Sequence, residues 1–462
     1  MVTPSSSVDH PPDAALVNLP AYVSQTDKVP TLPNEIWGEI AAFGTRDTVL
    51  NLRAANRMLQ AEAERVITKM SLRGSARVRA FADAKAFPYL QALTLNRCCD
   101  ADVAYLSAAL IRQARPSMTL VFDHGNIGIT AQGWASLYGV PLSALRVKFG
   151  MLDSADIEAL AHLTCDISMQ AYFSAGSLLA AAALPTIKRL WPIRSMFDDR
   201  VALAFRDHPL QELTLATAQG LSSLGLQYLA ANRSLRVLDL DGSQSNFDVH
   251  AARAFAENDT LETLSICEPL HHFMSEDACA ALSENRSLRT LSIPVPTALH
   301  YLGRMSSLKH LHLQGLSDEA RQQGQQGEPD ISADAVRGLI HGLRLASLRL
   351  EHVKINADAL PLLLESIHTD KLYLSEMRLD TRGVAALLSN KHVRDLEFVD
   401  VTIDKMDALA LATHPSLTRL SMQTYIAAAC DMLGAEDIQA LRAAWTVSGR
   451  APSQLAGMLA CS

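Results

Sequence analysis

Two stretches of the chain, ANRSLRVLDL at residues 231–240 and ENRSLRTLSI at residues 284–293, carry a spacing that the rest of the sequence repeats. In each, apolar residues stand at the first, fourth and sixth positions of a hexamer, LxxLxL. Ten copies are clear: Leu90, Leu93, Leu95; Leu142, Leu145, Val147; Leu210, Leu213, Leu215; Leu235, Leu238, Leu240; Leu261, Leu264, Ile266; Leu288, Leu291, Ile293; Leu308, Leu311, Leu313; Leu345, Leu348, Leu350; Val393, Leu396, Phe398; and Leu417, Leu420, Met422. Weaker copies end at Leu72, Phe122, Met169, Pro192 and Leu374, which brings the total to about fifteen.

The steps between successive copies predict the fold. Five of them, from 72 to 95, 192 to 215, 215 to 240, 240 to 266 and 266 to 293, are 23, 23, 25, 26 and 27 residues long. These steps lie within the period of roughly 20 to 29 residues that leucine-rich repeats show, in which each coil contains a short strand and a helix. We therefore predict an α/β leucine-rich-repeat solenoid, curved as a horseshoe, over residues 68–424.

The residues within and between the copies predict where each side chain points. Alternation along LxL directs the leucines into the core and the intervening residues onto the concave face. Apolar residues at helical spacing occupy Asp156–Leu163, Gly225–Ala231 and Ala251–Glu257 between the copies, so we expect helices on the outer side.

Two departures from a regular array stand out. The third residue after the last apolar position is usually Asn or Cys in such repeats, and here only Cys98 fits, so we expect irregular turns and uneven curvature. The step from Leu313 to Leu350 is 37 residues and contains a Gln/Gly-rich run at 315–330. We expect that run to form an exposed, mobile loop.

Charge and composition exclude several classes of protein. The net charge of −8 and the pI near 6.0 argue against a broad phosphate-binding surface, so nucleic acid is not an expected partner. The seven cysteines include no CxxC pair, which argues against a disulfide framework or a zinc site and suggests small buried residues in a reducing compartment. No run reaches the roughly 18 to 20 apolar residues of a membrane helix, so no membrane insertion is expected.

Residues 1–30 are rich in Ser, Pro and Asp and have no apolar central run, so they do not form a cleaved secretory signal. We expect this leader to be disordered. Its composition fits either a plain tail or a non-cleaved bacterial secretion signal.

A second pattern lies between the leader and the repeats. It opens with Leu32 and Pro33, and proline suits the first turn of a helix because its missing N–H needs no partner there. Ile36, Ile40 and Phe43 follow at i, i+4 and i+7 and therefore share one helix face.

With Asp47, Leu50, Leu52 and Arg57, this segment resembles the F-box, a three-helix unit, over residues 31–67. The resemblance implies binding to a Skp-type adaptor and, through it, to a cullin ubiquitin ligase. The implied adaptor-binding residues are Leu32, Pro33, Ile36, Ile40, Phe43, Leu50 and Leu52. The alternative is that the same residues only cap the solenoid, which needs such a cap at its end.

The helical segments add a second resemblance. GLQYLA at 225–230, AARAFA at 251–256 and GVAALL at 383–388 are similar to the GAxALA signature of the GALA proteins. These are F-box effectors that pathogenic bacteria inject into plant cells by a type III system. The resemblance implies a secreted effector that acts in the host cytoplasm or nucleus as the substrate receptor of a ligase. The alternative is a repeat scaffold that binds or blocks a host protein without a ligase.

Polar and aromatic residues at the outward positions of the strands form the candidate target-binding set. They are Arg146, Lys148, Trp191, Asp239, Asp241, His310, His312, Arg349, Glu351, Tyr373 and Glu397. Aromatic and Arg side chains dominate binding energy at protein interfaces. The alternative is a merely solvated strand face. His310 and His312 alternate along one strand, but no third ligand follows at useful spacing, so a metal site is not expected.

Nothing in the sequence indicates catalysis or a cofactor. It contains no P-loop, HExxH, GxSxG or kinase motif. Cys430 with Asp431, and Cys99 with Asp100, leave open a ligase with its own cysteine nucleophile, yet the large helical domain such enzymes need has no room after Met422. We expect residues 425–462 to form a helical cap on the last coil.

Overall fold

The computed structural model describes residues 68–83, 89–113, 117–123, 128–216, 219–243, 247–266, 274–316 and 330–423, with short pieces at 439–440, 442–443, 445–446 and 455–456. By its internal contacts the chain divides into two units, residues 1–67 and 68–462. The predicted leader and the predicted F-box-like segment lie outside the described residues. So do residues 317–329 of the predicted loop and most of the predicted C-terminal cap.

The unit from residue 68 contains one parallel sheet in which each strand pairs with the next in the sequence. Its sixteen described strands are ordered β1 to β16, the same order as in the sequence. They are β1 (Lys69–Arg73), β2 (Ala92–Asn96), β3 (Met118–Phe122), β4 (Leu142–Leu152), β5 (Asp166–Phe173), β6 (Ile187–Pro192), β7 (Glu212–Thr214), β8 (Val237–Asp239), β9 (Thr263–Ser265), β10 (Thr290–Pro294), β11 (His310–Gln314), β12 (Leu345–Glu351), β13 (Thr369–Ser375), β14 (Asp395–Val399), β15 (Arg419–Gln423) and β16 (Leu455–Ala456).

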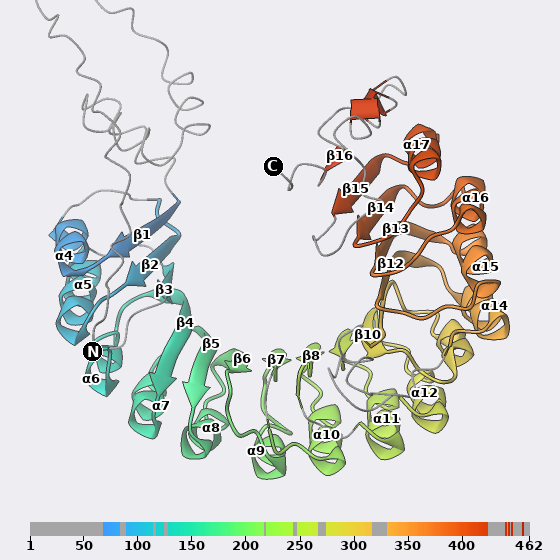
Figure 1. The fold of residues 1–462 in the computed structure, drawn as a ribbon. Helices are drawn as coiled ribbons and strands as arrows, with labels where there is room; N and C mark the ends of the chain where they lie inside the picture. The colour runs from blue at the N-terminus through green and yellow to red at the C-terminus, as the bar shows by residue number, and fades with distance from the viewer. Residues whose placement is uncertain are drawn as a thin grey trace, which may run out of the picture. The chain divides into compact units, whose positions relative to one another are not determined.

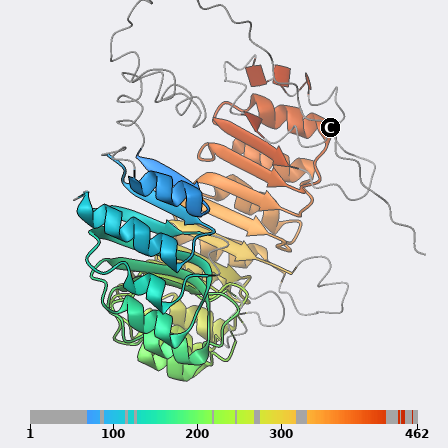
Figure 2. The same cartoon turned by 90° about the vertical axis from the view of Figure 1, so that its left-hand side faces the viewer.

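A helix follows most strands and lies on the outer side of the curved sheet (Figure 1). The helices are α4 (Ser75–Asp83), α5 (Asp100–Arg112), α6 (Ala131–Ala135), α7 (Ser154–Leu160), α8 (Ala175–Ala181), α9 (Asp199–Ala204), α10 (Ser223–Ala230), α11 (Val249–Ala256), α12 (Glu276–Leu282), the 3₁₀ helix η1 (Leu299–Arg304), α14 (Ala333–Gly342), α15 (Ala359–Ser366), α16 (Thr381–Ser389) and α17 (Lys405–Thr413). Figure 2 shows successive coils stacked side by side, each with its strand and helix. This is a leucine-rich-repeat solenoid, as the period predicts. No helix within the described ranges is long and apolar enough to cross a bilayer.

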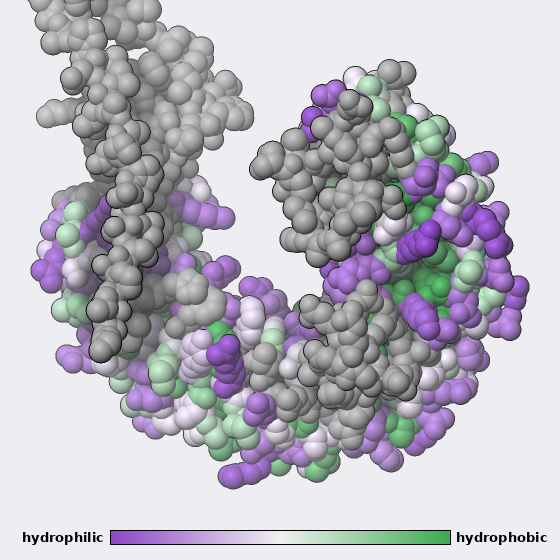
Figure 3. Space-filling model, in the orientation of Figure 1, coloured by the Kyte–Doolittle hydropathy of each residue, from purple (hydrophilic) through white to green (hydrophobic). Residues whose placement is uncertain are grey.

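The core lies between the sheet and the helices and is built from the predicted apolar positions. Every one of the fifteen predicted motif ends lies on one of the strands β1 to β15 or directly after it. Leu291 and Ile293 of β10 are fully buried, as is Leu313 of β11. Hydrophilic residues cover much of the outer border of the coils, where the helices meet solvent (Figure 3).

Buried asparagines form a polar part of the core just before the strands. Asn258, three residues before Leu261, is 2% exposed. Its amide donates to the carbonyls of Ala230 (2.7 Å) and Asn232 (3.1 Å) in the previous coil, and its oxygen accepts from the Leu261 N–H (2.7 Å). Asn232, Asn285 and Asn390 repeat this arrangement. The backbone-satisfying asparagines thus precede the strand, whereas the usual repeat pattern predicts them after it.

The turns after the strands are more regular than we expected. In several coils the second residue after the last apolar position has a positive φ, the left-handed conformation. These residues are Gly74, Arg97, Arg194, Gly242, His352, Glu376 and Asp400. The turn is therefore specified by a repeated backbone conformation, and the missing Asn or Cys does not disrupt it.

Helix N-termini also connect neighbouring coils. Asp199 at the start of α9 accepts hydrogen bonds from the backbone N–H (2.9 Å) and the hydroxyl (2.6 Å) of Ser222, the N-cap of α10. Asp100 and Thr130 form the same pair between α5 and α6. Each such carboxylate accepts hydrogen bonds from the N-cap residue of the next coil. It therefore fixes the position of one helix relative to the next on the outer side.

Candidate functional site

One row of outward side chains crosses the sheet from β8 to β15, and we call it the central row. Strand pairing places one residue of each strand in register with the next: Asp239, Ser265, Ser292, His312, Arg349, Tyr373, Glu397 and Ser421. Five of these eight residues belong to the predicted target-binding set. The structure therefore brings these five predicted residues, from Asp239 to Glu397, into one row, although they are up to 158 positions apart in the sequence.

The middle of the central row is a connected network around Glu351, which lies two residues after Arg349 on β12. The carboxylate of Glu351 accepts hydrogen bonds from His312 Nε2 (3.1 Å) and Arg349 Nε (3.0 Å), and it forms an ion pair with Arg349 Nη2 (2.8 Å). The Arg349 guanidinium lies 4.0 Å from the centre of the Tyr373 ring, a cation–π contact. On the other side, His312 Nδ1 lies 2.8 Å from the Ser292 hydroxyl.

These contacts fix the orientation of the imidazole and of the guanidinium before any partner arrives. When the neutral His312 ring donates from Nε2 to Glu351, its Nδ1 accepts from the Ser292 hydroxyl. The side chains of His312 and Glu351 are 24% and 22% exposed, and that of Arg349 is 44% exposed. These hydrogen bonds and ion pairs hold the network in place, and its charged and aromatic side chains remain partly exposed to solvent.

The electrostatics of the network follow from these contacts. The hydrogen bond from His312, with the charge and hydrogen bonds of Arg349, lowers the pKa of the Glu351 carboxyl to about 2. Asp241, in the turn after β8, has the opposite shift, because partial burial and the neighbouring carboxylate of Asp239 raise its pKa. His312 and Glu351, on β11 and β12, also contribute to the electrostatic environment of the predicted residue Asp241.

The other predicted residues lie on the concave face but apart from the network. His310 Nδ1 contacts the Ser347 hydroxyl at 2.7 Å, in the row next to the central one. Lys148 and Trp191 are both aligned with Gln170, on β4 to β6, and Arg146 precedes Lys148 on β4. The site is therefore divided between β4–β6 and β8–β14.

This division separates the two aromatic residues of the predicted target-binding set. Trp191, 39% exposed, lies on β6, and Tyr373 lies on β13 with Arg349 over its ring. Seven strand-to-strand steps of about 4.8 Å each separate them along the sheet, so one small epitope cannot contact both.

Sequence reasoning missed the serines that complete the site. Ser292 holds His312, and Ser347 contacts His310. Both occupy outward strand positions, so the alternation that selects His312 and Arg349 would have included them. They were missed because a serine carries no charge or ring that marks it as an interface residue.

Comparisons with known proteins do not assign the chain to a family. A scan against protein-family models matches none, and a search of curated proteins finds no match. Among solved structures, an internalin (inlF) from Listeria monocytogenes is similar at 16% identity, with 87% of this chain and 94% of that chain covered and a TM-score of 0.36. The TLR13 chain of a TLR13–ssRNA13 complex is similar at 14% identity over 73% of this chain and 57% of that chain, with a TM-score of 0.38.

The thiols of the described cysteines are mostly inaccessible. Cys98, Cys165 and Cys279 are buried, as expected, and burial raises the pKa of Cys98 to about 11 and that of Cys279 to about 12. Cys99 is exposed, against the expectation of burial. Its thiol donates a hydrogen bond to Asp102 Oδ2 (3.3 Å) at the start of α5.

Two further hypotheses from the sequence concern a cysteine nucleophile and a metal site. Cys430, the rival nucleophile, lies outside the described residues. Within the described residues no group of three or more His, Cys, Asp or Glu side chains is placed to hold a metal ion, and His312 is instead engaged by Ser292 and Glu351.

Proposed function

We propose that the chain is a non-catalytic substrate receptor of a cullin ubiquitin ligase, in which the central row of the sheet holds a target protein. The observation that supports target binding is the network of His312, Arg349, Glu351 and Tyr373 on the open strand face. Interface energy concentrates in Arg and aromatic side chains that are rigid and surrounded by polar groups. These side chains have both properties before binding.

The ligase half of the proposal rests on the sequence. Leu32, Pro33 and the apolar face of Ile36, Ile40 and Phe43 follow the F-box pattern, and they would supply the contact with a Skp-type adaptor. The adaptor would join the chain to a cullin and a charged conjugating enzyme, so that transfer to the target depends on effective concentration. The similarity of the helical segments to the GALA signature supports a bacterial effector that is delivered by a type III system into a host cell.

Adaptor binding is tested by the double substitution Leu32→Ala with Pro33→Ala in the full chain. We expect the wild type to bind a purified Skp-type adaptor in calorimetry and the variant to lose that binding, because the change removes apolar contact and the fixed backbone entering the first helix. Far-UV circular dichroism of the same samples should be unchanged, since the repeats begin about forty residues later. A wild type that never binds the adaptor would refute the ligase half and leave the scaffold alternative.

Target binding is tested by Arg349→Ala with Tyr373→Ala. In a reconstituted reaction with adaptor, cullin, conjugating enzyme, ubiquitin and host extract, we expect the wild type to direct ubiquitin onto a defined set of proteins and the variant to lose that set. The matched control is Arg337→Ala with Tyr105→Ala, which removes an exposed arginine from α14 and an exposed tyrosine from α5 on the helical side.

The outcomes separate the alternatives. Loss of the target set with intact adaptor affinity supports the central row as the target site. Equal loss in the control variant, or no loss in Arg349→Ala with Tyr373→Ala, contradicts it. Transfer that persists without adaptor and cullin, and stops on Cys430→Ala, would establish a ligase with its own nucleophile.

A further inference from the structure

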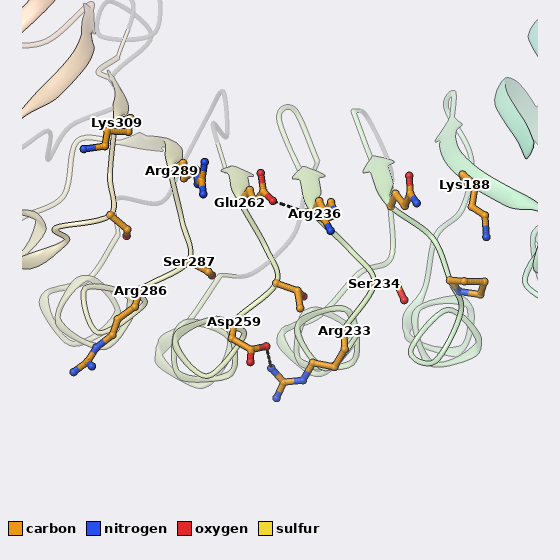
Figure 4. A pocket seen from close by; sticks show the side chains of 14 residues that line it. Lys188, Arg233, Ser234, Arg236, Asp259, Glu262, Arg286, Ser287, Arg289 and Lys309 are labelled. Carbon is orange, nitrogen blue, oxygen red and sulfur yellow. Dashed lines mark hydrogen bonds and ion pairs between the residues drawn. The ribbon is translucent and has the colours of Figure 1, made fainter.

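A basic groove runs along the edge of the sheet where strands β6 to β11 begin. Its volume is about 890 Å³. One residue per coil forms its strand-side wall, and backbone hydrogen bonds of 2.8 Å connect each with the next, from Gln211 N–H to the Lys188 carbonyl onward. This row consists of Lys188, Gln211, Arg236, Glu262, Arg289 and Lys309. Because the ladder fixes their spacing, these residues form one continuous row across six coils, and Figure 4 labels all of them except Gln211.

A second, shorter row forms the helix-side wall of the groove. It contains Arg233, Asp259 and Arg286, which lie nearer the helix ends in Figure 4. A line of hydroxyl residues, including Ser234 and Ser287, lies between the two rows. The groove is therefore open, polar and elongated across the coils.

Charge is concentrated at one end of the groove. Arg233 pairs with Asp259 (2.9 Å), and Arg236 pairs with Glu262 (2.6 Å). Within the described part of the chain, Arg286, Arg289 and Lys309 have no acidic partner. Six basic and two acidic side chains line the groove, giving it a net charge of +4 on a chain whose net charge is −8. Such a local excess attracts an anionic ligand, above all at low ionic strength.

The lining favours a protein segment over a nucleic acid. Proteins that hold single strands stack bases on aromatic side chains, and none of the fourteen residues that line this groove is aromatic. Asp259 and Glu262 also lie within the two rows, where they would repel a backbone with a phosphate on every nucleotide. A peptide carries its charges on alternate side chains and can leave neutral residues opposite these carboxylates.

The length of the groove fits a short extended peptide. Five steps between coils at about 4.8 Å span about 24 Å, which an extended chain covers in about seven residues at 3.3 Å each. Carboxylates at alternate positions of such a chain recur every 6.6 Å or so, within reach of long Arg and Lys side chains on adjacent coils.

We propose that this groove binds an extended acidic segment of a partner protein, with Arg286, Arg289 and Lys309 as the main cationic contacts. The groove shares no residue with the central row or with the predicted adaptor-binding segment, and the proposal does not depend on either. It gives the solenoid a second recognition element, whose specificity is for acidic residues at alternate positions of an extended chain.

The test uses a fluorescein-labelled decapeptide of alternating Glu and Ser and the full-length chain, with binding followed by fluorescence anisotropy at low salt. We expect saturable binding that weakens steeply between 20 and about 200 mM salt. Arg289→Glu with Lys309→Glu should weaken it at least tenfold. The matched control, Arg200→Glu with Arg253→Glu, makes the same charge change at exposed sites on α9 and α11 and should stay within about twofold of the wild type.

Three results would overturn the proposal. One is no peptide binding at 20 mM salt by a wild type whose circular dichroism shows it to be folded. Another is an equal loss in the groove and control variants, which would mean that only net charge matters. The third is tighter binding of a twenty-residue oligothymidylate than of the peptide, with the same dependence on Arg289 and Lys309, which would make the groove a nucleic-acid site.

Discussion

At the scale of the residue, the polar core of this solenoid depends on a few buried asparagines. Asn258 satisfies two carbonyls of the previous coil and the N–H groups of Thr260 and Leu261. Asn258→Ala leaves these buried groups without partners, so we expect a loss of roughly 2–4 kcal/mol in the free energy of unfolding. Urea denaturation measures it. Asn96→Ala, which removes one hydrogen bond to Ser71, is the control and should cost less than about 1 kcal/mol. Equal losses would contradict the role given to Asn258.

The network around Glu351 makes a residue-level prediction about pH. The pKa of Glu351 falls from 4.5 to about 2 on folding, because His312 and Arg349 stabilise the ionised carboxylate. The resulting stability is present above pH 4.5 and is lost as the pH falls toward 2. We therefore expect Glu351→Gln to destabilise the chain most near pH 6 and progressively less below pH 4.5, as urea midpoints would show. Glu365→Gln, an exposed change on α15, should follow the wild type throughout. A loss of stability in Glu351→Gln that is the same at every pH would exclude the ionised carboxylate as its cause.

At the scale of the element, the contact between η1 and α14 depends on glycine. The step from Ile293 to Leu313 is only 20 residues, and a 3₁₀ helix takes the place of a full helix in that coil. A Cβ on Gly338 would overlap His300 of η1, so Gly338→Ala should cost about 1–3 kcal/mol in unfolding free energy.

The control for this element is Gly176→Ala on α8, where a Cβ meets Ser154 Oγ at 3.5 Å and Ser174 Oγ at 3.8 Å, both ordinary van der Waals contacts. That change should stabilise the chain by about 0.5–1 kcal/mol, because alanine favours the helix. Thermal denaturation of both variants compares them directly. If both alanine variants were destabilised, or both stabilised, the close approach of Gly338 to His300 would not explain the effect of Gly338→Ala.

At the scale of the whole molecule, each coil buries its leucines only against its neighbours. Leu348 and Leu350 of β12 are 1% and 0% exposed because β13 covers them. Truncation after Leu350 should therefore lower the melting temperature of the retained coils, or make the fragment insoluble, as circular dichroism and light scattering would detect. A soluble fragment that melts at the wild-type temperature would mean that the coils fold independently.

The sequence by itself determined the repeat, the strand positions, the apolar core and the outward direction of residues such as His312, Arg349 and Tyr373. These features follow from alternation within a strand and from helical periodicity, which are local properties of the chain. The spacing of Asn258 to Leu261 is equally local, but the usual repeat pattern expects such asparagines after the strand and therefore does not predict this ladder.

Only the tertiary structure decided which outward residues are neighbours. His312 meets Glu351 across 39 residues, and Arg289 lies beside Lys309 across 20, because stacked coils of unequal length are aligned by their strands and not by sequence spacing. The pairing of Arg349 with Tyr373, the separation of Trp191 from them and the line of the basic groove all arise from this alignment. Since coil length varies from 20 to 37 residues, no fixed interval in the sequence predicts these contacts.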